Sequence, residues 1–375
     1  MPMHYVLSFS LLLLGVISGK INENDTYRKR FIVILFIFFG VLIGLRSEHV
    51  GNDTQEYICT FHSIATTDSI SHFFWRFEIG YVVMNRLISY ITKNPQIVLI
   101  VSSAITMTAF ARFILRYSQN VWLSACLFYF MGYFGRSANT IRLCLAISFV
   151  LVAYDFLLTK KMAPFVAMVI LASLFHQTAI IFLLAWIVKD MKLGVRNILI
   201  MLIIAITALW AFPLILKLSL VVFPTYEHYI DSVYLNAEIR LASIINFLVE
   251  MSVVIMIFAS ANQKILSKKT GKIRGDHEKT FVFSNANAEV LLLVGLFITL
   301  VSFRFNLLGR ISLYFNVFSL VFVPNALKSL ENSKVQRLLT FAVVISFFLY
   351  QTTVLILRPE WNTIYPYSMF IRGEN

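Results

Sequence analysis

The sequence predicts an all-α fold: a polytopic bundle of about 10–12 membrane-spanning helices in a single domain, residues 1–375. Hydrophobic residues make up 59% of the chain and charged residues 14%, whereas soluble chains carry about 25% charged residues. Apolar runs of roughly 18–25 residues recur from end to end, which is the length a helix needs to cross about 30 Å of hydrocarbon. Helices are expected because an open strand would leave its backbone groups unpaired in lipid.

The candidate spanning segments follow one another without an internal repeat or a low-complexity linker. The first has no basic region ahead of it and no clear cleavage site, so we expect it to be a retained helix and not a signal peptide. The third is short, and the sequence leaves open whether it spans or forms a re-entrant or interfacial helix. The segments are 3–19, 31–45, 79–92, 96–117, 120–135, 139–158, 163–187, 198–222, 241–260, 288–304, 306–326 and 335–357.

Basic residues in the connections predict the orientation, because Lys and Arg collect in cytoplasmic loops. One basic cluster lies at 20–30 and another at 261–286. The connections 46–78 and 223–240 are therefore predicted to face outward. The same rule accounts for the net charge of +13, so this charge does not indicate nucleic acid.

The first polar constellation begins at the end of the second segment. Arg46 is followed by the turn Gly51-Asn52-Asp53-Thr54. This pattern is typical of a helix N-cap beside a snorkelling arginine. It also suits an arginine aimed at a phosphate, with a carboxylate close by. Glu78, which opens the next segment, either complements the helix dipole or belongs to the same polar site.

A second constellation lies further along the chain. Asn139 and Arg142 share one helical face at i, i+3, and His176 lies deep within segment 163–187. A charged residue at a helix centre costs about 2.5–3.5 kcal/mol on insertion scales, so such groups tend to face a cavity or a partner. A positional anchor and a backbone-bonded histidine are the alternatives. A neutral imidazole would suit a general base.

The last candidates are Arg310 and Tyr314, which share a face at i, i+4. Arg46, Arg142 and Arg310 would provide three arginines for one anionic group, if their side chains converge. The sequence has no P-loop, no dinucleotide fingerprint and no metal-ligand spacing. We therefore expect neither a metal nor another cofactor.

In order and spacing, these motifs resemble the EpsG family of exopolysaccharide and O-antigen polymerases (Wzy type). The similarity is dense from about 46 to 186 and thinner afterwards. The family usually has Gly-Thr-Asp where this chain has Gly51-Asn52-Asp53. The motifs are Arg46…Gly51-Asn52-Asp53-Thr54…Tyr57, Phe77-Glu78-x-Gly80-Tyr81, Asn139-x-x-Arg142-x-x-x-Ala146, Ala172-x-x-Phe175-His176-x-Thr178-Ala179 and Arg310…Tyr314.

The resemblance implies a glycosyltransferase of the bacterial cytoplasmic (inner) membrane. It would join undecaprenyl-diphosphate-linked oligosaccharide repeat units at the outer face, with membrane lipid, a flippase and a chain-length regulator as partners. Alternatives are a flippase or transporter of the same lipid-linked sugars, or another polytopic glycan transferase such as a ligase or acyltransferase.

We predict roles for eight residues of such a polymerase. Three arginines are expected to bind the diphosphate. An aspartate or a histidine is expected to deprotonate the acceptor hydroxyl. The remaining three would complete the substrate site. The arginines are Arg46, Arg142 and Arg310; the candidate bases are Asp53 and His176; and the others are Glu78, Asn139 and Tyr314.

Overall fold

The computed structural model describes residues 1–191, 194–211, 214, 217–218, 244–256, 276–303, 308–330, 332–361 and 363–370. In this part of the chain the regular structure is helical, apart from an isolated β-bridge between Arg46 and Met369. The predicted all-α class is confirmed. The connection 223–240, predicted to face outward, lies outside the described residues.

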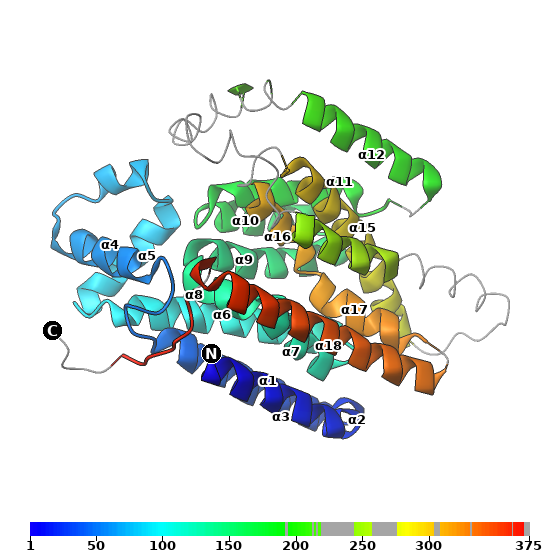
Figure 1. Cartoon of the computed structure of the whole chain (residues 1–375). Helices are drawn as coiled ribbons and strands as arrows, with labels where there is room; N and C mark the ends of the chain where they lie inside the picture. Colours follow the sequence, from blue (N-terminus) through cyan, green and yellow to red (C-terminus); the bar gives the residue numbers. More distant parts are fainter. Residues whose placement is uncertain are drawn as a thin grey trace. The chain divides into compact units, whose positions relative to one another are not determined.

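The α-helices differ widely in length (Figure 1). Short 3-10 turns separate several of them. The 3-10 turns are η1 Gly15–Ile17, η2 Ser71–Trp75, η3 Gln177–Leu183 and η5 Pro359–Trp361. The α-helices are α1 Pro2–Leu14, α2 Ser18–Glu23, α3 Asp25–Gly44, α4 Thr54–Thr66, α5 Ile79–Ile91, α6 Gln96–Tyr117, α7 Val121–Phe130, α8 Tyr133–Asn139, α9 Ile141–Leu158, α10 Met162–Ser173, α11 Leu184–Val188, α12 Val195–Trp210, α15 Asp276–Val301, α16 Leu308–Asn316, α17 Ser319–Lys328 and α18 Ser333–Leu357.

Several helices are long and apolar enough to cross a membrane. In the described residues four meet this condition, Pro2–Glu23, Gln96–Tyr117, Ile141–Leu158 and Ser333–Leu357. A fifth is added if α16 and α17, bent by 42°, form one span. The chain is therefore a multi-pass membrane protein. The total of about ten to twelve spans stays a prediction, because seven further apolar helices in the described residues have only 10–17 residues, and a straight crossing needs roughly 20.

The chain divides into two compact units. Unit 1 comprises Met1–Val152, Ile170–Gln177 and Leu327–Asn375, and unit 2 comprises Ala153–Val169 and Thr178–Ala326. In unit 2, α15 packs against α16 and α12. Whether the two units act as the single domain expected from the sequence stays a prediction.

In unit 1, α3 and α6 pack side by side in opposite directions. Near the start of α3, Arg28 Nη2 donates to the carbonyl oxygen of Ser118, just after α6, at 2.8 Å. At the other end, Gln96 Nε2 donates to the carbonyl oxygen of Gly44 at 2.6 Å. The segment 45–95 therefore leaves and returns at the same end of this helix pair. With only 13 residues in α5, this favours a re-entrant or interfacial helix for the short third segment.

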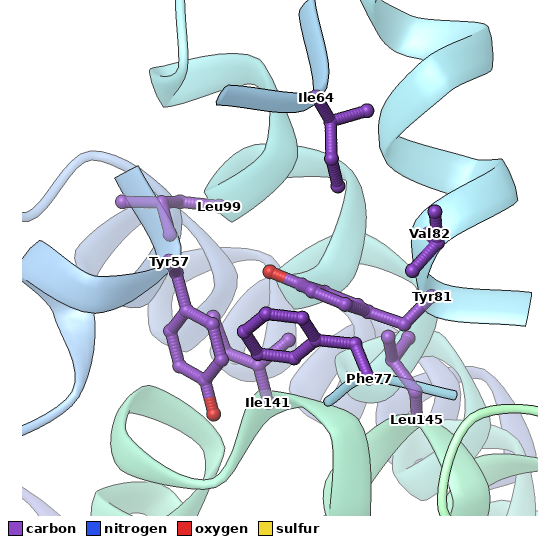
Figure 2. Close-up of a cluster of buried hydrophobic side chains, with 8 residues drawn as sticks. All are labelled: Tyr57, Ile64, Phe77, Tyr81, Val82, Leu99, Ile141 and Leu145. Carbon is purple, nitrogen blue, oxygen red and sulfur yellow. The ribbon is translucent and has the colours of Figure 1, made fainter. Parts of the chain in front are cut away.

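The helices α4 and α5 pack against each other at the Gly44 end of α3 (Figure 1). A buried apolar cluster joins them to the beginnings of α6 and α9 (Figure 2). The aromatic rings of Tyr57 and Tyr81 meet edge to face in this cluster, with centroids 5.9 Å apart. Eight residues form it: Tyr57, Ile64, Phe77, Tyr81, Val82, Leu99, Ile141 and Leu145.

A C-terminal strap, consisting of residues 359–361 and 363–370, covers the turn that follows α3. Its backbone pairs with this turn at both ends: Phe370 N–H donates to Leu45 O at 2.8 Å, and Gly51 N–H donates to Thr363 O at 3.0 Å. The Asn52 side chain adds a bond from Nδ2 to Glu360 O at 2.9 Å. Residues more than 300 positions apart thus form one structure around Arg46.

Candidate functional site

Arg46 is enclosed by protein. Its side chain is 0% exposed. Nε donates to Thr54 Oγ1 at 3.0 Å, Nη1 to Ile43 O at 2.5 Å and Nη2 to Ala138 O at 2.9 Å. Burial lowers the pKa of Arg46 to about 10, so the group is cationic at neutral pH. The three acceptors are neutral oxygens, and they lie on α3, α4 and α8. Arg46 therefore links these three helices. The predicted role in diphosphate binding stays a prediction.

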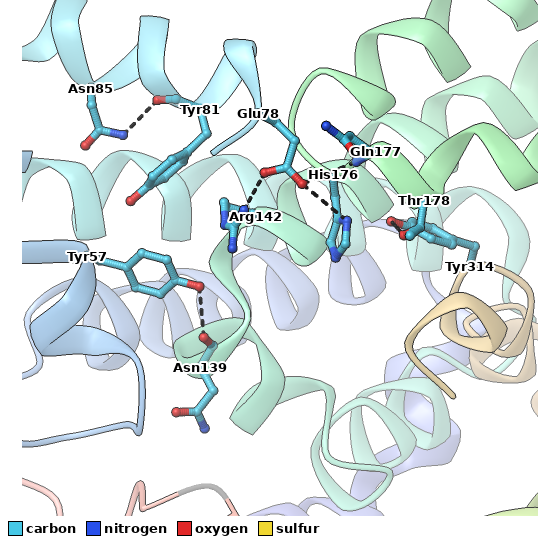
Figure 3. Close-up of polar contacts among 10 residues, drawn as sticks. All are labelled: Tyr57, Glu78, Tyr81, Asn85, Asn139, Arg142, His176, Gln177, Thr178 and Tyr314. Atoms are coloured by element: carbon cyan, nitrogen blue, oxygen red, sulfur yellow. Dashed lines mark hydrogen bonds and ion pairs between the residues drawn. The ribbon is translucent and has the colours of Figure 1, made fainter. Parts of the chain in front are cut away.

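Asn139 holds the turn after Arg46 in place. Its Oδ1 accepts from the backbone N–H of Asn52 at 2.6 Å, and its carbonyl accepts from the Tyr57 hydroxyl at 3.1 Å (Figure 3). Gly51 has φ +94°, and a Cβ there would lie 2.9 Å from Asn139 Oδ1. This position therefore favours glycine both for its backbone conformation and for space.

Two further groups lie at this turn or in the helix that follows it, α4. Asp53 is half-buried and occupies the N-cap position of α4, without a side-chain bond to the helix start. Burial raises the pKa of Tyr57 to about 12, so its hydroxyl is protonated and donates to Asn139. The predicted N-cap position is confirmed, and the predicted role of Asp53 as a base stays a prediction.

Glu78 is the centre of a second polar cluster, which we call the Glu78 cluster (Glu78, Arg142, His176 and the backbone of Gln177). The carboxylate is 7% exposed, and its Oε2 accepts from Arg142 Nη1 at 2.5 Å. Its Oε1 lies 3.5 Å from His176 Nδ1 and accepts from Gln177 N–H at 3.3 Å. Figure 3 shows the carboxylate between the guanidinium and the imidazole. Three predicted residues, far apart in sequence, therefore meet.

Local structure explains how these side chains come together. Glu78 is the N-cap residue of α5, and Arg142 lies in the first turn of α9. His176 follows the end of α10, where Gly80 N–H donates to Leu174 O at 2.8 Å. A Cβ at Gly80 would lie 2.6 Å from that oxygen, so glycine allows the approach. The motif Phe77-Glu78-x-Gly80 thus supplies both the carboxylate of the cluster and the glycine at which the end of α10 contacts α5.

Arg142 is placed differently from Arg46. Its side chain is 29% exposed, and its guanidinium carbon lies 5.2 Å from the centroid of the Phe77 ring. Its Nε has no hydrogen-bond partner among the described residues. An arginine in this position can contact an anionic ligand while Glu78 keeps it oriented. A carboxylate beside Nδ1 fixes the tautomer of an imidazole, which is the arrangement a general base needs.

Arg310 and Tyr314 belong to unit 2. Tyr314 is buried, with its hydroxyl 3.2 Å from the Thr178 hydroxyl, and Arg310 is exposed. The two residues were predicted to share one helical face, but one side chain is buried and the other is exposed. The convergence of Arg310 with Arg142 stays a prediction. In the described residues, no group of three or more His, Cys, Asp or Glu side chains could hold a metal ion.

The sequence did not single out two groups that contact the Glu78 cluster or belong to it. The Gln177 backbone and the Phe77 ring were not among the candidates, although both adjoin a named residue. Tyr81 is also fully buried, and its hydroxyl has no hydrogen-bond partner among the described residues. Adjacency to Glu78 and His176 was the available signal for Phe77 and Gln177.

Comparison with known proteins covers nearly the whole chain. The EpsG family model matches residues 29–369, which include every candidate residue. A curated relative, the amylovoran biosynthesis protein AmsC of Erwinia amylovora, is 21% identical over 189 residues, 48% of this chain and 50% of the relative. The aligned part of the chain thus spans about half the length of that relative. No solved structure matches. The extent of the family match shows that this chain belongs to the EpsG family.

Proposed function

We propose that this chain is a surface-polysaccharide polymerase that joins lipid-diphosphate-linked repeat units at the outer face of the bacterial cytoplasmic membrane. Three observations support this: the family, the multi-pass architecture, and the similarity to a protein named for amylovoran biosynthesis. The undecaprenyl carrier, the flippase and the chain-length regulator are those that the family resemblance implies.

The distribution of basic residues supports an outward-facing site. Arg28 and Arg30 near the start of α3 lie at the same end of the helix pair as Arg116 in α6. By the positive-inside rule this end is cytoplasmic. The turn after Gly44 then lies at the outer end, and Asn139, three residues before Arg142, contacts that turn. A site there would meet lipid-linked sugars after they have been flipped.

The Glu78 cluster supports a metal-independent glycosyl transfer. The acceptor hydroxyl oxygen would attack the anomeric carbon of the donor, and the bond from that carbon to the diphosphate oxygen would break. His176 would take the hydroxyl proton at Nε2, since Nδ1 lies beside Glu78. Arg142 would contact the departing diphosphate as its charge develops. Asp53 is the alternative base. Arg46 stays a predicted diphosphate ligand, although its enclosed side chain favours a positioning role.

The observation that carries the proposal is that one carboxylate contacts both Arg142 and His176. The test is a polysaccharide ladder gel from cells that lack the protein and are complemented with wild type, His176→Gln or Arg142→Ala. Single-repeat material without a ladder is expected for both variants, with normal amounts of membrane protein on an immunoblot. His62→Gln, an exposed histidine of α4, is the matched control and should restore the ladder.

Two results would contradict the proposal. A full ladder with both His176→Gln and Arg142→Ala would remove the Glu78 cluster from the reaction. Repeat units stranded on the cytoplasmic leaflet of the deletion strain would identify a flippase instead. The second result is distinguishable because the units would then resist enzymes added to the outside of intact spheroplasts.

A further inference from the structure

The helix α5 carries an apolar stripe that is exposed in the described part of the chain. Ile79, Val83 and Leu87, spaced four residues apart, are all exposed, and Tyr90 and Ile91 continue the stripe. Leu87 is 59% exposed. The opposite face is buried and includes Tyr81 and Asn85 in the core. Residues at this spacing occupy one side of a helix, so α5 has a second apolar face, which points away from the core.

The partner helix α4 presents the opposite chemistry. Its exposed residues are polar and include Gln55, Glu56, Cys59, His62 and Ser63. At 1.5 Å per residue, each helix of this pair is about 20 Å long. Both are too short to cross the roughly 30 Å of hydrocarbon, and the segment starts and ends on one side. The pair therefore has one face suited to water and one suited to lipid.

Packing against α6 gives the depth of α5. Ile88 clusters with Val98, and Ile97 and Val101 pack around them. These α6 residues belong to the first turns of a candidate spanning helix that begins at Gln96. The first turns of a spanning helix lie where the hydrocarbon meets the headgroups. The exposed stripe of α5 is therefore at the level of this boundary.

Side chains around the hairpin suit the same boundary. Trp75, in η2 just before α5, is 73% exposed, and Tyr90 is also exposed. Tryptophan and tyrosine favour membrane–water interfaces. Arg86 lies 5.7 Å from the Tyr90 ring centroid and donates to Thr67 O at 2.6 Å, while Lys93 donates to Ala65 O at 3.2 Å. Both cations hydrogen-bond to the end of α4 and the loop after it, at the level where they would contact lipid phosphates.

We propose that the α4–α5 hairpin, residues 54–91, lies on the outer leaflet with the stripe of α5 seated in the headgroup–acyl boundary of the lipid. Because Glu78 is the N-cap of α5, this seating also sets the height of the Glu78 cluster relative to the headgroups. That second part, and the choice of the outer leaflet, rest on the proposed function. It would place Arg142 at the level where a lipid-linked diphosphate lies.

The experiment uses the full-length chain in liposomes with an environment-sensitive dye on single cysteines. Cys59 on α4 is exposed, whereas Cys126 and Cys144 are buried, so the native chain carries its own control label. The test position is Leu87→Cys in a Cys59→Ser background, with Val83→Cys as a second site in case the first variant folds poorly. Quenching by iodide reports water, and quenching by lipids brominated near the top of the acyl chain reports the boundary.

We expect brominated lipid to quench the dye at position 87 at least threefold more than iodide does, and the reverse at Cys59. Preferential iodide quenching at both Leu87→Cys and Val83→Cys would overturn the inference. Protection from both quenchers, with cross-linking between chains, would overturn it in favour of a protein partner. A membrane-impermeant maleimide on intact spheroplasts should label Cys59. Labelling after lysis alone would refute the outward orientation while leaving the interfacial seating intact.

Discussion

Arg46 and Arg142 belong to the same unit and were predicted to bind the same diphosphate, yet their surroundings differ. Arg46 is fully enclosed, and its three guanidinium nitrogens donate to neutral oxygens of the protein. Arg142 is 29% exposed and pairs with a carboxylate that also contacts His176. An arginine whose donors are all directed at protein oxygens holds helices together. A partly exposed arginine beside a histidine can instead contact a substrate. Substitutions at these positions and at their partners test this contrast.

The largest effect is expected from Arg46→Ala. Each lost hydrogen bond from a charged donor is worth about 1.5–3 kcal/mol, and the carbonyls of Ile43 and Ala138 would be left buried without this donor. We expect the protein to be depleted from the membrane, as measured by immunoblot and fluorescence-detected size exclusion. Arg76→Ala, an exposed arginine paired with Glu56, is the control and should leave the amount unchanged. A normal amount of inactive Arg46→Ala protein would instead support the predicted role of Arg46 in binding the diphosphate.

The next effect concerns the pairing of Glu78 with Arg142. Arg142→Ala alone leaves a largely buried carboxylate without its cationic partner, and Glu78→Gln with Arg142→Ala removes that mismatch. We expect the double variant to be more stable than the sum of the single changes predicts, with a coupling of about 0.5–3 kcal/mol. Thermal melting of purified protein in detergent would measure it. Additive losses would show that the pair is not formed.

A smaller effect should follow from loosening the strap around Arg46. The Asn52 side chain donates to Glu360 O and Trp361 O and also bonds with the Thr363 hydroxyl. Asn52→Ala should cost about 0.5–1.5 kcal/mol for each bond lost. Faster proteolytic release of a C-terminal tag would report the loosened strap. Gln55→Ala, an exposed position on α4, should leave the release rate as in the wild type.

The smallest effect on stability is expected at Arg310, which is exposed on α16. Arg310→Ala should change the free energy of unfolding by no more than about 0.5 kcal/mol, as usual for surface positions. The ladder gel then tests whether three arginines converge, since a shortened ladder at unchanged stability supports that prediction. A large loss of stability would instead indicate that Arg310 has a structural role.

The fold class followed from local properties, and so did much of the candidate site. The long apolar runs at 96–117, 139–158 and 335–357 appear as α6, α9 and α18, since length and hydropathy act within one helix. The sequence marks Glu78, Arg142 and His176 individually as polar residues in apolar surroundings. It does not predict that they contact one another, because a hydrogen bond between residues 64 positions apart depends on how the helices pack.

By itself, the sequence determined that this protein is built from helices in lipid, which residues are candidates for its chemistry, and which ends carry the basic clusters. Composition and periodicity suffice for this because the cost of placing a charge or an open strand in hydrocarbon is paid locally. Only the tertiary structure shows that Arg46 is enclosed, that Glu78 contacts both Arg142 and His176, and that the segment 45–95 leaves and returns at one end of the α3–α6 pair. Each of these depends on contacts between distant segments, which local free energies do not specify.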